Sequence, residues 1–405
     1  AMICRACNNG EVREYLDLGE MPMANAFVYP SHGEDAEPRL HTVVGVCNKC
    51  NMSQLMEVWP RDQVFHDNYA YYSSTSSVMD EHWSQLAAQI GEMLFSSGPI
   101  VEIGCNDGAL LEKLVGQVDS VIGVEPSGGV ADAAENKGLH IERSFFDKDI
   151  AQRIVERWGR AQLVVGGNVL SHIEDLDGFA EALDALLEPA GVFIFEDPWI
   201  LDILESNAYD QIYNEHVYFF SLHSLSAFFR SRGWEIYRVE PQPVHGGSLR
   251  VWGSREGAHR VEDSVRGILL LERDAELTQF EEYAEFGERA AASRGALLEL
   301  LDGLKGKKIV GYAASSKGTV ILNYCGIGEH RIPYVVDNTP GKIGMLMPGV
   351  HIPIVAETAF RQDDPDYALL LSYNHLREIA EKEQEWVSKG GRFITHVPYP
   401  SVIRA

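Results

Sequence analysis

Residues 101–111, VEIGCNDGALL, carry the clearest indication of the fold. This stretch begins as an apolar strand, turns at Gly104 and Gly108, and continues into a helix. Glycine at such a turn lets a ligand approach the backbone just before a helix N-terminus. The glycines do not follow the GxGxxG spacing, so the turn favours a cofactor without a pyrophosphate over a dinucleotide.

Strands and helices continue to alternate after this stretch. We expect strands in SVIGVEP (120–126), AQLVVGGNVL (161–170) and GVFIFEDP (191–198), with helices at 129–138 and near 177–187. Buried strands that alternate with helices indicate a parallel, doubly wound sheet. The sequence therefore predicts an α/β fold with a central class I, Rossmann-like domain over residues 66–260, in which an amphipathic helix begins near Ser77.

An acidic residue, Glu125, ends the second of these strands, where its carboxylate can accept both hydroxyls of a ribose. Together with the glycine turn and the loop GGNVLSHI (166–173), it indicates S-adenosylmethionine. An NAD-binding or nucleotide-free α/β domain is the alternative. The predicted cofactor-binding residues are Glu102, Gly104, Asn106, Gly108, Glu125 and Asn168.

Two CxxC pairs, CRAC and CNKC, lie in the first fifty residues and supply Cys4, Cys7, Cys47 and Cys50. Two such pairs are what a tetrahedral zinc ion requires. Four thiolates fill the shell and leave no position for water, so we expect a structural zinc in a β-rich module over residues 1–65. Two disulfides are unusual in a cytoplasmic protein, and a catalytic dithiol needs only one pair.

The C-terminal part, residues 261–405, is expected to hold a long connecting helix over 262–303 and a smaller Rossmann-like α/β domain. In GYAASSKG (311–318), Ser315, Ser316 and Lys317 stand at a turn that opens a helix, a place suited to phosphate oxygens. Asp337 and Lys342 follow the next strand. A domain kept only for packing is the alternative, and the lack of GxGxxG disfavours a second redox cofactor.

The charge and hydropathy of the chain limit the kinds of molecule that it is expected to bind. A formal net charge of −26 disfavours nucleic acid. No apolar run is long enough for a membrane span and no apolar leader opens the chain, so we expect a cytoplasmic protein without a membrane partner. At 405 residues the chain should hold two or three domains, and a monomer is the expected state. Because the chain is acidic overall, a phosphorylated substrate would need a few Arg or Lys side chains and helix N-termini in its binding site.

The segment YNEHVYFFS, residues 213–221, combines titratable groups with apolar aromatics. Histidine suits a general base near neutral pH, so one interpretation is a proton-handling loop that closes over the substrate, although a stretch of this kind more often serves packing. The alternative is an aromatic strand edge that contains one histidine. In an extended segment Glu215 and His216 would point to opposite faces.

Six motifs now stand in order: the CxxC pairs, YAYYSSTSS (69–77), EIGCNDGALL (102–111), YNEHVYFFS, PVHGGSLR (243–250) and GYAASSKG. In this order they resemble the sugar C-methyltransferases of antibiotic deoxysugar pathways, and among these the 3-C-methyltransferases of dTDP-4-keto-deoxyhexoses. The resemblance spans nearly the whole chain. It implies a zinc domain, an S-adenosylmethionine domain and a C-terminal domain that helps to hold the nucleotide sugar.

The resemblance also implies roles for single residues. His216 would be the catalytic base, Glu215 and Tyr213 would polarise it or bind the sugar, and Tyr71 would hydrogen-bond the keto or enolate oxygen. His245, beside two glycines, would contact the substrate. Spacing does not decide which member of the segment carries the proton. His172 is expected to cap a helix, and Asn214 replaces an acidic residue of some relatives.

The expected reaction is carbon methylation beside a ketone. A C4 ketone acidifies the proton on C3, so a base can leave an enolate whose carbon attacks the methyl group. Three alternatives stay open: O- or N-methylation of a sugar or small metabolite, an NAD-dependent nucleotide-sugar oxidoreductase, and a cofactor-sensing scaffold without turnover.

Overall fold

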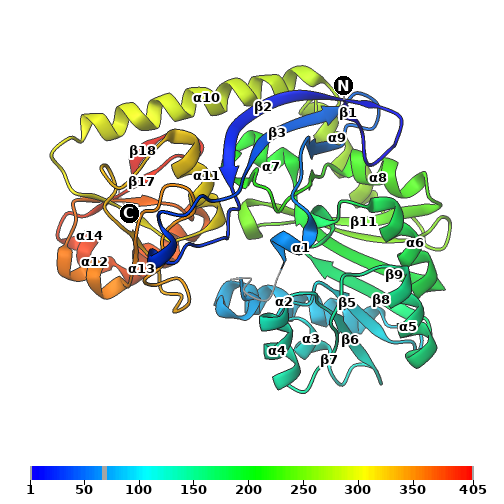
Figure 1. Cartoon of the computed structure of the whole chain (residues 1–405). Helices are drawn as coiled ribbons and strands as arrows, with labels where there is room; N and C mark the ends of the chain where they lie inside the picture. Colours follow the sequence, from blue (N-terminus) through cyan, green and yellow to red (C-terminus); the bar gives the residue numbers. More distant parts are fainter. Residues whose placement is uncertain (1, 66–70, 404–405) are drawn as a thin grey trace.

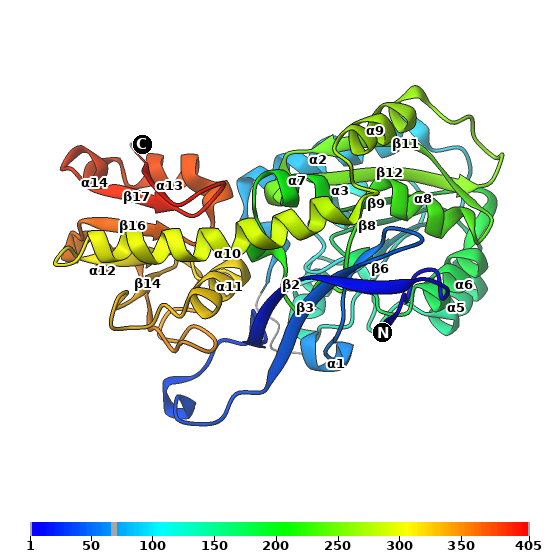
Figure 2. The ribbon, with the colours of Figure 1, turned by 90° about the horizontal axis from the view of Figure 1, so that it is seen from above.

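Three β-sheets organise the protein in a computed structural model that describes residues 2–65 and 71–403. The N-terminal sheet lies against the central α/β unit and reaches toward the C-terminal α/β unit, and the long helix α10 (Phe280–Gly303) runs from beside this sheet to the C-terminal unit (Figures 1 and 2). Among the described residues, none of the helices has both the length and the apolar character that crossing a membrane would require.

The N-terminal sheet is antiparallel and has the order β1-β2-β3-β4-β10. Its strands are β1 (Met2–Ile3), β2 (Glu11–Pro22), β3 (Arg39–Cys47), β4 (Ser53–Leu55) and β10 (Tyr218–Phe219), and it is accompanied by η1 (Pro30–His32) and α1 (Arg61–Val64). The predicted β-rich module is thus present. Its last strand comes from the YNEHVYFFS segment, with Tyr218 opposite Gln54.

The central sheet has the order β7-β6-β5-β8-β9-β12-β11. Its parallel strands are β5 (Ile100–Ile103), β6 (Val121–Val124), β7 (His140–Glu142), β8 (Ala161–Gly167), β9 (Leu187–Pro198) and β11 (Trp234–Gln242), and β12 (Ser248–Arg255) runs antiparallel between β9 and β11. The dinucleotide-binding fold lacks this antiparallel insertion next to the fifth strand. The order therefore confirms the class I methyltransferase fold.

Helices cover both faces of the central sheet (Figure 1). They are α2 (Ser77–Met93), α3 (Leu111–Leu114), α4 (Gly128–Asn136), α5 (Lys148–Trp158), α6 (Leu176–Leu186), α7 (Ile200–Glu205) and α8 (Leu222–Arg230). Side-chain caps set several starts: Ser76 accepts from Met79 N, Asp147 from Ile150 N, and Ser221 with Ser224 forms a capping box.

The single connecting helix expected over 262–303 is wrong, because two helices occupy this range: α9 (Asp263–Asp274) and α10 (Phe280–Gly303). Glu276 adopts a left-handed φ of 57° and the N–H of Leu277 returns to the oxygen of Glu272. The break turns Leu277 into the core, where it is 1% exposed. Burial of that side chain offsets the interruption of the helix.

The C-terminal sheet has the order β15-β14-β13-β16-β17-β18 and is parallel except for its last strand. Its strands are β13 (Ile309–Tyr312), β14 (Val335–Val336), β15 (Ile354–Val355), β16 (Tyr367–Leu370), β17 (Arg392–Thr395) and β18 (Ser401–Ile403). The helices are α11 (Ser316–Cys325), α12 (Glu357–Asp363), α13 (Leu376–Lys382) and α14 (Gln384–Ser388). The predicted smaller α/β unit is confirmed.

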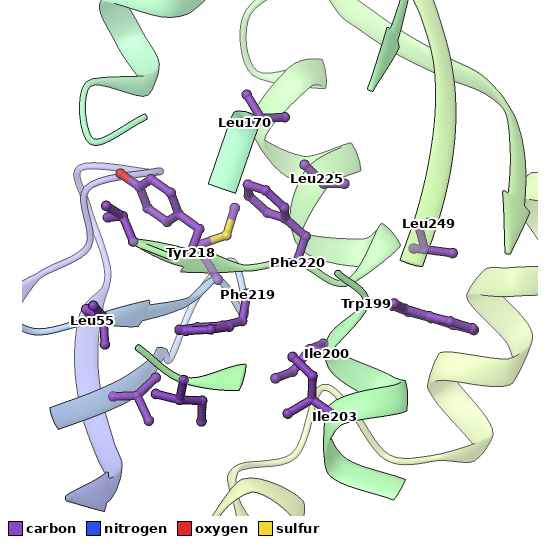
Figure 3. Packing of buried hydrophobic residues seen from close by; sticks show 14 of the residues in the cluster. Leu55, Leu170, Trp199, Ile200, Ile203, Tyr218, Phe219, Phe220, Leu225 and Leu249 are labelled. Carbon is purple, nitrogen blue, oxygen red and sulfur yellow. The ribbon is translucent and has the colours of Figure 1, made fainter. Parts of the chain in front are cut away.

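The aromatic end of YNEHVYFFS lies in the core at the junction of the first two sheets. Tyr218, Phe219 and Phe220 are each 1% exposed. Figure 3 shows them with Leu55 of β4 on one side and Ile200 of α7 on the other. The segment is therefore a turn that leads into a buried strand, and its polar front half is held by an apolar anchor.

Candidate active site

The four predicted zinc ligands converge, although they come from two parts of the N-terminal module. The sulfurs of Cys4 and Cys50 are 3.6 Å apart, those of Cys7 and Cys47 are 3.7 Å apart, and all four lie within 4.8 Å of one another. A tetrahedral zinc with Zn–S bonds of about 2.3 Å separates its sulfurs by about 3.8 Å. These residues fit a zinc ion, and the sulfurs are too far apart for disulfides.

Hydrogen bonds to the sulfurs complete this centre. Gln54 Nε2 donates to Cys4 Sγ at 3.1 Å, and the N–H groups of Gly10 and Lys49 donate to Cys7 and Cys47 at 3.3 and 3.4 Å. Such donors stabilise thiolate ligands and orient them. The ligand set leaves no open position, so zinc here holds the module together.

A cavity of about 920 Å³ lies where the three sheets meet. Its wall combines the carboxyl ends of β5, β6 and β8, the turn that precedes β10, and the N-terminus of α11. The predicted site residues that line it are Tyr71, Gly104, Asn106, Glu125, Asn168, Tyr213, Glu215, His216, His245, Ser315, Ser316, Lys317, Asp337 and Lys342. The structure thus brings together residues that are more than 200 positions apart.

At one end of the cavity the turn after β5 faces the end of β6. Gly104 has a φ of 65°, and a Cβ there would lie 2.8 Å from Val169 Cγ2. Glu125 accepts the N–H of Asn106 at 2.8 Å on Oε2 and that of Ser127 at 2.9 Å on Oε1. Each oxygen keeps acceptor capacity for a hydroxyl, so this end fits a ribose-containing cofactor. Burial raises the pKa of Glu125.

The side chain of Asn106 holds a loop of the protein. Its Oδ1 accepts the N–H of Ser73 at 2.9 Å, and its Nδ2 donates to the main-chain oxygen of Tyr71 at 3.1 Å. Asp107 accepts the N–H of Ser74 at 3.2 Å. Both residues therefore fasten the stretch around η2 (Ser73–Thr75) beside the cofactor turn. This arrangement places Tyr71 in the cavity wall.

Two predicted cofactor residues, Glu102 and Gly108, do not line the cavity. Gly108 has a φ of 81°, and a Cβ there would lie 2.4 Å from Leu139 Cδ1, so glycine is needed for packing. Glu102 is 5% exposed. Its pKa is raised well above the usual value, mainly by burial and to a smaller extent by the negative charges of Glu125 and Asp107. Asn168 lines the cavity with a φ of 53°, and its N–H donates to the oxygen of Glu196 at 2.6 Å.

At the centre of the cavity His216 is held in one orientation. Its Nδ1 lies 3.1 Å from the main-chain oxygen of Gln211, which requires a proton on Nδ1. Its ring packs on those of Tyr213 and His172, at centroid distances of 4.3 and 5.0 Å. Burial, followed by His172, lowers the pKa of His216 well below 6.5. The imidazole is neutral at pH 7, and Nε2 is the nitrogen that can accept a proton.

The expectation that His172 caps a helix is wrong. His172 ends η3 (Leu170–His172), which has no side-chain cap; its Nδ1 meets the main-chain oxygen of Glu215, and it lines the cavity. Burial lowers its pKa to about 4. It belongs to the site because β8 ends here, a position that the sequence already favoured for ligand contacts.

The polar half of YNEHVYFFS is tied to the N-terminal module. Asn214 Oδ1 accepts the N–H of Ala24 at 3.2 Å, and its Nδ2 donates to the oxygen of Pro22 at 3.0 Å. Asn25 Nδ2 donates to Glu215 Oε1 at 2.5 Å and lines the cavity. Asn214 makes both bonds because an amide donates as well as accepts, which a carboxylate does not. No local signal in the sequence pointed to Asn25.

His245 reaches the cavity from η5 (Val244–Gly246) with a left-handed φ of 55°. Its buried Nε2 has no hydrogen-bond partner among residues 2–65 and 71–403. Burial, followed by Lys317, lowers its pKa to about 4. A strained backbone and an unpartnered buried nitrogen in a cavity wall are features of ligand-binding positions.

The far end of the cavity is the N-terminus of α11. The Ser315 hydroxyl accepts the N–H of Gly318 at 3.0 Å and donates to the oxygen of Leu371 at 2.7 Å, so it caps the helix and has no proton left for a phosphate. The first N–H groups, at Ser316 and Lys317, have no intrahelical partner and suit an anion.

Two lysines stand beside this helix end. Lys342 Nζ donates to the oxygen of Ala314 at 2.8 Å, and Lys317 Nζ donates to Asn374 Oδ1 at 3.3 Å. Burial lowers the pKa of both lysines. Asp337 accepts the N–H groups of Ala314 and Thr339, each at 2.8 Å, and so shapes the turn.

Comparison with known families assigns each part of the chain. Residues 4–65 match a zinc binding domain, residues 77–239 a methyltransferase domain, and residues 243–398 a C-methyltransferase C-terminal domain. These matches agree with the cysteine cluster, the central sheet and the C-terminal sheet.

Individual known proteins are similar to the chain over different lengths. The chain is 33% identical to C-methyltransferase NovU of Streptomyces niveus over 407 residues, which cover 99% of this chain and 97% of NovU. A ubiquinone biosynthesis O-methyltransferase of Rhodopseudomonas palustris is 30% identical over 98 residues, 24% of this chain and 38% of that one. Magnesium protoporphyrin IX methyltransferase from Synechocystis PCC 6803 superposes with a TM-score of 0.34 and 15% identity over 44% of this chain and 79% of that chain.

The full-length match to NovU, the three domain matches and the central sheet lead to one conclusion. The chain belongs to the C-methyltransferase family and is an S-adenosylmethionine-dependent methyltransferase with a structural zinc module.

Proposed function

We propose that this enzyme methylates the carbon next to the keto group of a nucleotide-linked 4-keto-deoxysugar, at C3, with a dTDP-linked hexose as the expected substrate. One observation carries the proposal: a neutral imidazole with a single proton-accepting nitrogen, His216, lines the same cavity as Glu125 and the two lysines beside α11. The cavity therefore joins a cofactor end, a base and an anion-binding end.

The base is proposed to act as follows. His216 Nε2 takes the proton from C3, and the electron pair of that C–H bond moves into an enolate on the sugar. Gln211 holds Nδ1–H throughout, so the ring does not need to turn before it accepts the proton. S-adenosylmethionine, held by the turn at Gly104 and by Glu125, supplies the electrophilic methyl group.

Donors near the base are proposed to stabilise the enolate oxygen. The Tyr213 ring lies against His216, and Tyr71 reaches the same cavity from the loop that Asn106 fastens. Burial, followed by Glu215, raises the pKa of Tyr213, so its hydroxyl keeps its proton and can donate it in a hydrogen bond. A preorganised donor at a developing oxyanion lowers the barrier in a cavity shielded from water.

The diphosphate is proposed to lie at α11. The local positive charge comes from the main-chain N–H groups of Ser316 and Lys317 and from the ammonium groups of Lys317 and Lys342. Because the net charge of the protein is −26, a diphosphate needs such a locally positive site. His245, whose Nε2 has no hydrogen-bond partner in the described parts of the chain, is proposed to bond a sugar hydroxyl or the keto oxygen between the two ends.

The test compares His216→Asn with wild type in deuterated water, using S-adenosylmethionine, a dTDP-4-keto-6-deoxyhexose and mass spectrometry. An asparagine amide retains a donor for the Gln211 oxygen but has no basic nitrogen. His223→Asn, seven positions away and outside the cavity wall, is the matched control.

We expect methylation and C3 deuterium exchange in wild type and the control, and loss of both in His216→Asn. Exchange that persists in His216→Asn would assign the base elsewhere. A methyl group found on oxygen or nitrogen, without C3 exchange, would replace carbon methylation by the O- or N-methylation alternative, and turnover dependent on NAD would support the oxidoreductase.

A further inference from the structure

The connection between β2 and β3 leaves the N-terminal sheet and enters the active site. Residues 22–28 of this connection, here called the strap, run between the YNEHVYFFS turn and the C-terminal unit. Asn25 of the strap lines the cavity beside Glu215. The zinc module thus supplies part of the cavity wall as well as a sheet beneath it.

The strap is fixed from both sides at Ala24, which is 1% exposed. The N–H of Ala24 bonds the side chain of Asn214, and its main-chain oxygen accepts the hydroxyl proton of Thr319 in α11 at 2.8 Å. Further along, Val28 and Leu346 exchange two main-chain hydrogen bonds of 3.0 and 2.8 Å. Asn25 is therefore presented from a backbone that both neighbouring units hold.

The fixed backbone places an amide against a carboxylate. Asn25 Nδ2 donates to Glu215 Oε1 at 2.5 Å, and Glu215 is 5% exposed. The titratable groups that interact with Glu215 include Lys342, which it stabilises in the charged form, and Tyr213. A donated hydrogen bond favours the charged form of a carboxyl group and fixes the direction of its oxygens.

We propose that Asn25 is a positioning residue for methyl transfer, which fixes the Glu215 carboxylate between Tyr213 and Lys342 and so sets the environment of the neighbouring base, His216. This inference rests on the proposed function of the site. It gives the zinc module a direct part in the reaction: the module presents Asn25, and the turn that carries Glu215 and His216 is pinned to it through Asn214.

The test is Asn25→Asp, with Asn8→Asp as the matched control. Asn8 also belongs to the zinc module and also donates its amide to a carboxylate, Asp177 at 2.8 Å, but that pair is exposed and outside the cavity wall. Both substitutions replace an amide that bonds a carboxylate by a second carboxylate. They differ in whether that carboxylate is buried in the site or exposed outside it.

In Asn25→Asp two carboxyl groups share a buried position and cannot both ionise readily. We expect kcat at neutral pH to fall about 10- to 100-fold, the acidic limb of the kcat–pH profile to move to higher pH, and part of the loss to be recovered in alkaline buffer. Asn8→Asp should retain the wild-type profile. Equal profiles for the two variants would overturn the inference.

A second variant distinguishes loss of the hydrogen bond from misfolding, and a second measurement tests the contact independently of the proposed function. Asn25→Ala, which adds no charge, should lower kcat with zinc content and cofactor affinity unchanged. In the NMR spectrum of protein labelled with ¹⁵N-asparagine, the side-chain amide signal of Asn25 is the one that disappears in Asn25→Ala. This signal should shift in Glu215→Gln if the two side chains are in contact, and an unshifted signal would refute the contact whether or not wild type methylates a keto-sugar. If wild type methylates no keto-sugar, that result by itself would refute only the proposed function.

Discussion

Nδ1 of His216 lies 3.1 Å from the main-chain oxygen of Gln211, and this contact leaves Nε2 as the proton-accepting nitrogen of a buried imidazole. Gln211 ends η4 (Tyr209–Gln211), which follows α7 along the chain. The orientation of the proposed base therefore depends on the position of η4, which holds the Gln211 oxygen against the ring.

The pH dependence should identify His216. Burial, followed by His172, lowers its pKa well below 6.5, so wild-type kcat/KM should stay high at pH 6.5 and fall only at lower pH, where Nε2 becomes protonated. His172→Asn removes the neighbouring imidazole but keeps a donor for the Glu215 oxygen, so the pKa of His216 should rise and activity should be lost at higher pH than in wild type. A limb that moves the opposite way would contradict this assignment.

Cofactor binding should depend on Glu125. Glu125→Gln replaces one charged acceptor by an amide and should weaken S-adenosylmethionine binding about 10- to 100-fold in calorimetry, because hydrogen bonds to charged groups are the stronger ones. Glu142→Gln, at the end of the neighbouring strand β7 and outside the cavity wall, should bind as wild type does. Equal affinities for the two variants would place the ribose elsewhere.

The lysines at α11 should act on the nucleotide sugar and leave the methyl donor unaffected. Lys342→Met should raise the KM for a dTDP-keto-sugar about 10-fold or more and weaken the dependence of binding on salt, because a charged contact to phosphate is lost. Lys317→Met should do the same, with S-adenosylmethionine affinity unchanged. The exposed Lys389→Met is the control, and a raised KM there would indicate a general charge effect.

Zinc affinity should depend on Gln54, which bonds the Cys4 sulfur and lies opposite Tyr218 in the sheet. Gln54→Leu keeps the volume but removes the donor, and it should lower zinc affinity about 10- to 100-fold in competition with a chromophoric chelator. Gln85→Ala, exposed on α2, should match wild type. Because β10 pairs with β4, loss of the metal should also reduce activity. A metal-free protein that remained active would show that activity does not depend on the zinc centre.

Local patterns in the sequence predicted much of the architecture. The apolar strand and glycine turn of residues 101–111 indicated the central fold, and the CxxC spacing indicated the metal centre, because both signals need only a few adjacent residues. The positions of Glu125 and of the α11 turn could be predicted for another reason. Parallel strands end at one edge of a sheet, so the residues that follow them converge there.

Other features depended on contacts that no short stretch contains. The helix predicted over 262–303 breaks because Leu277 is buried, and the left-handed φ of Glu276 allows it. The Ser315 hydroxyl has no proton left for a phosphate because the oxygen of Leu371, 56 positions away, accepts it. Gly108 fits the side chain of Leu139 and does not line the cavity.

The local sequence was enough to indicate the layered α/β fold, the zinc ligands and the residue types proposed to bind the cofactor, accept a proton and bind phosphate. Which of these residues meet, and in what protonation state, follows from the tertiary fold. Asn25 and Glu215 are 190 positions apart, and their hydrogen bond follows from a strap held between two units. The protonated nitrogen of His216 follows from one main-chain oxygen and from burial, because a titratable side chain takes its charge from its surroundings.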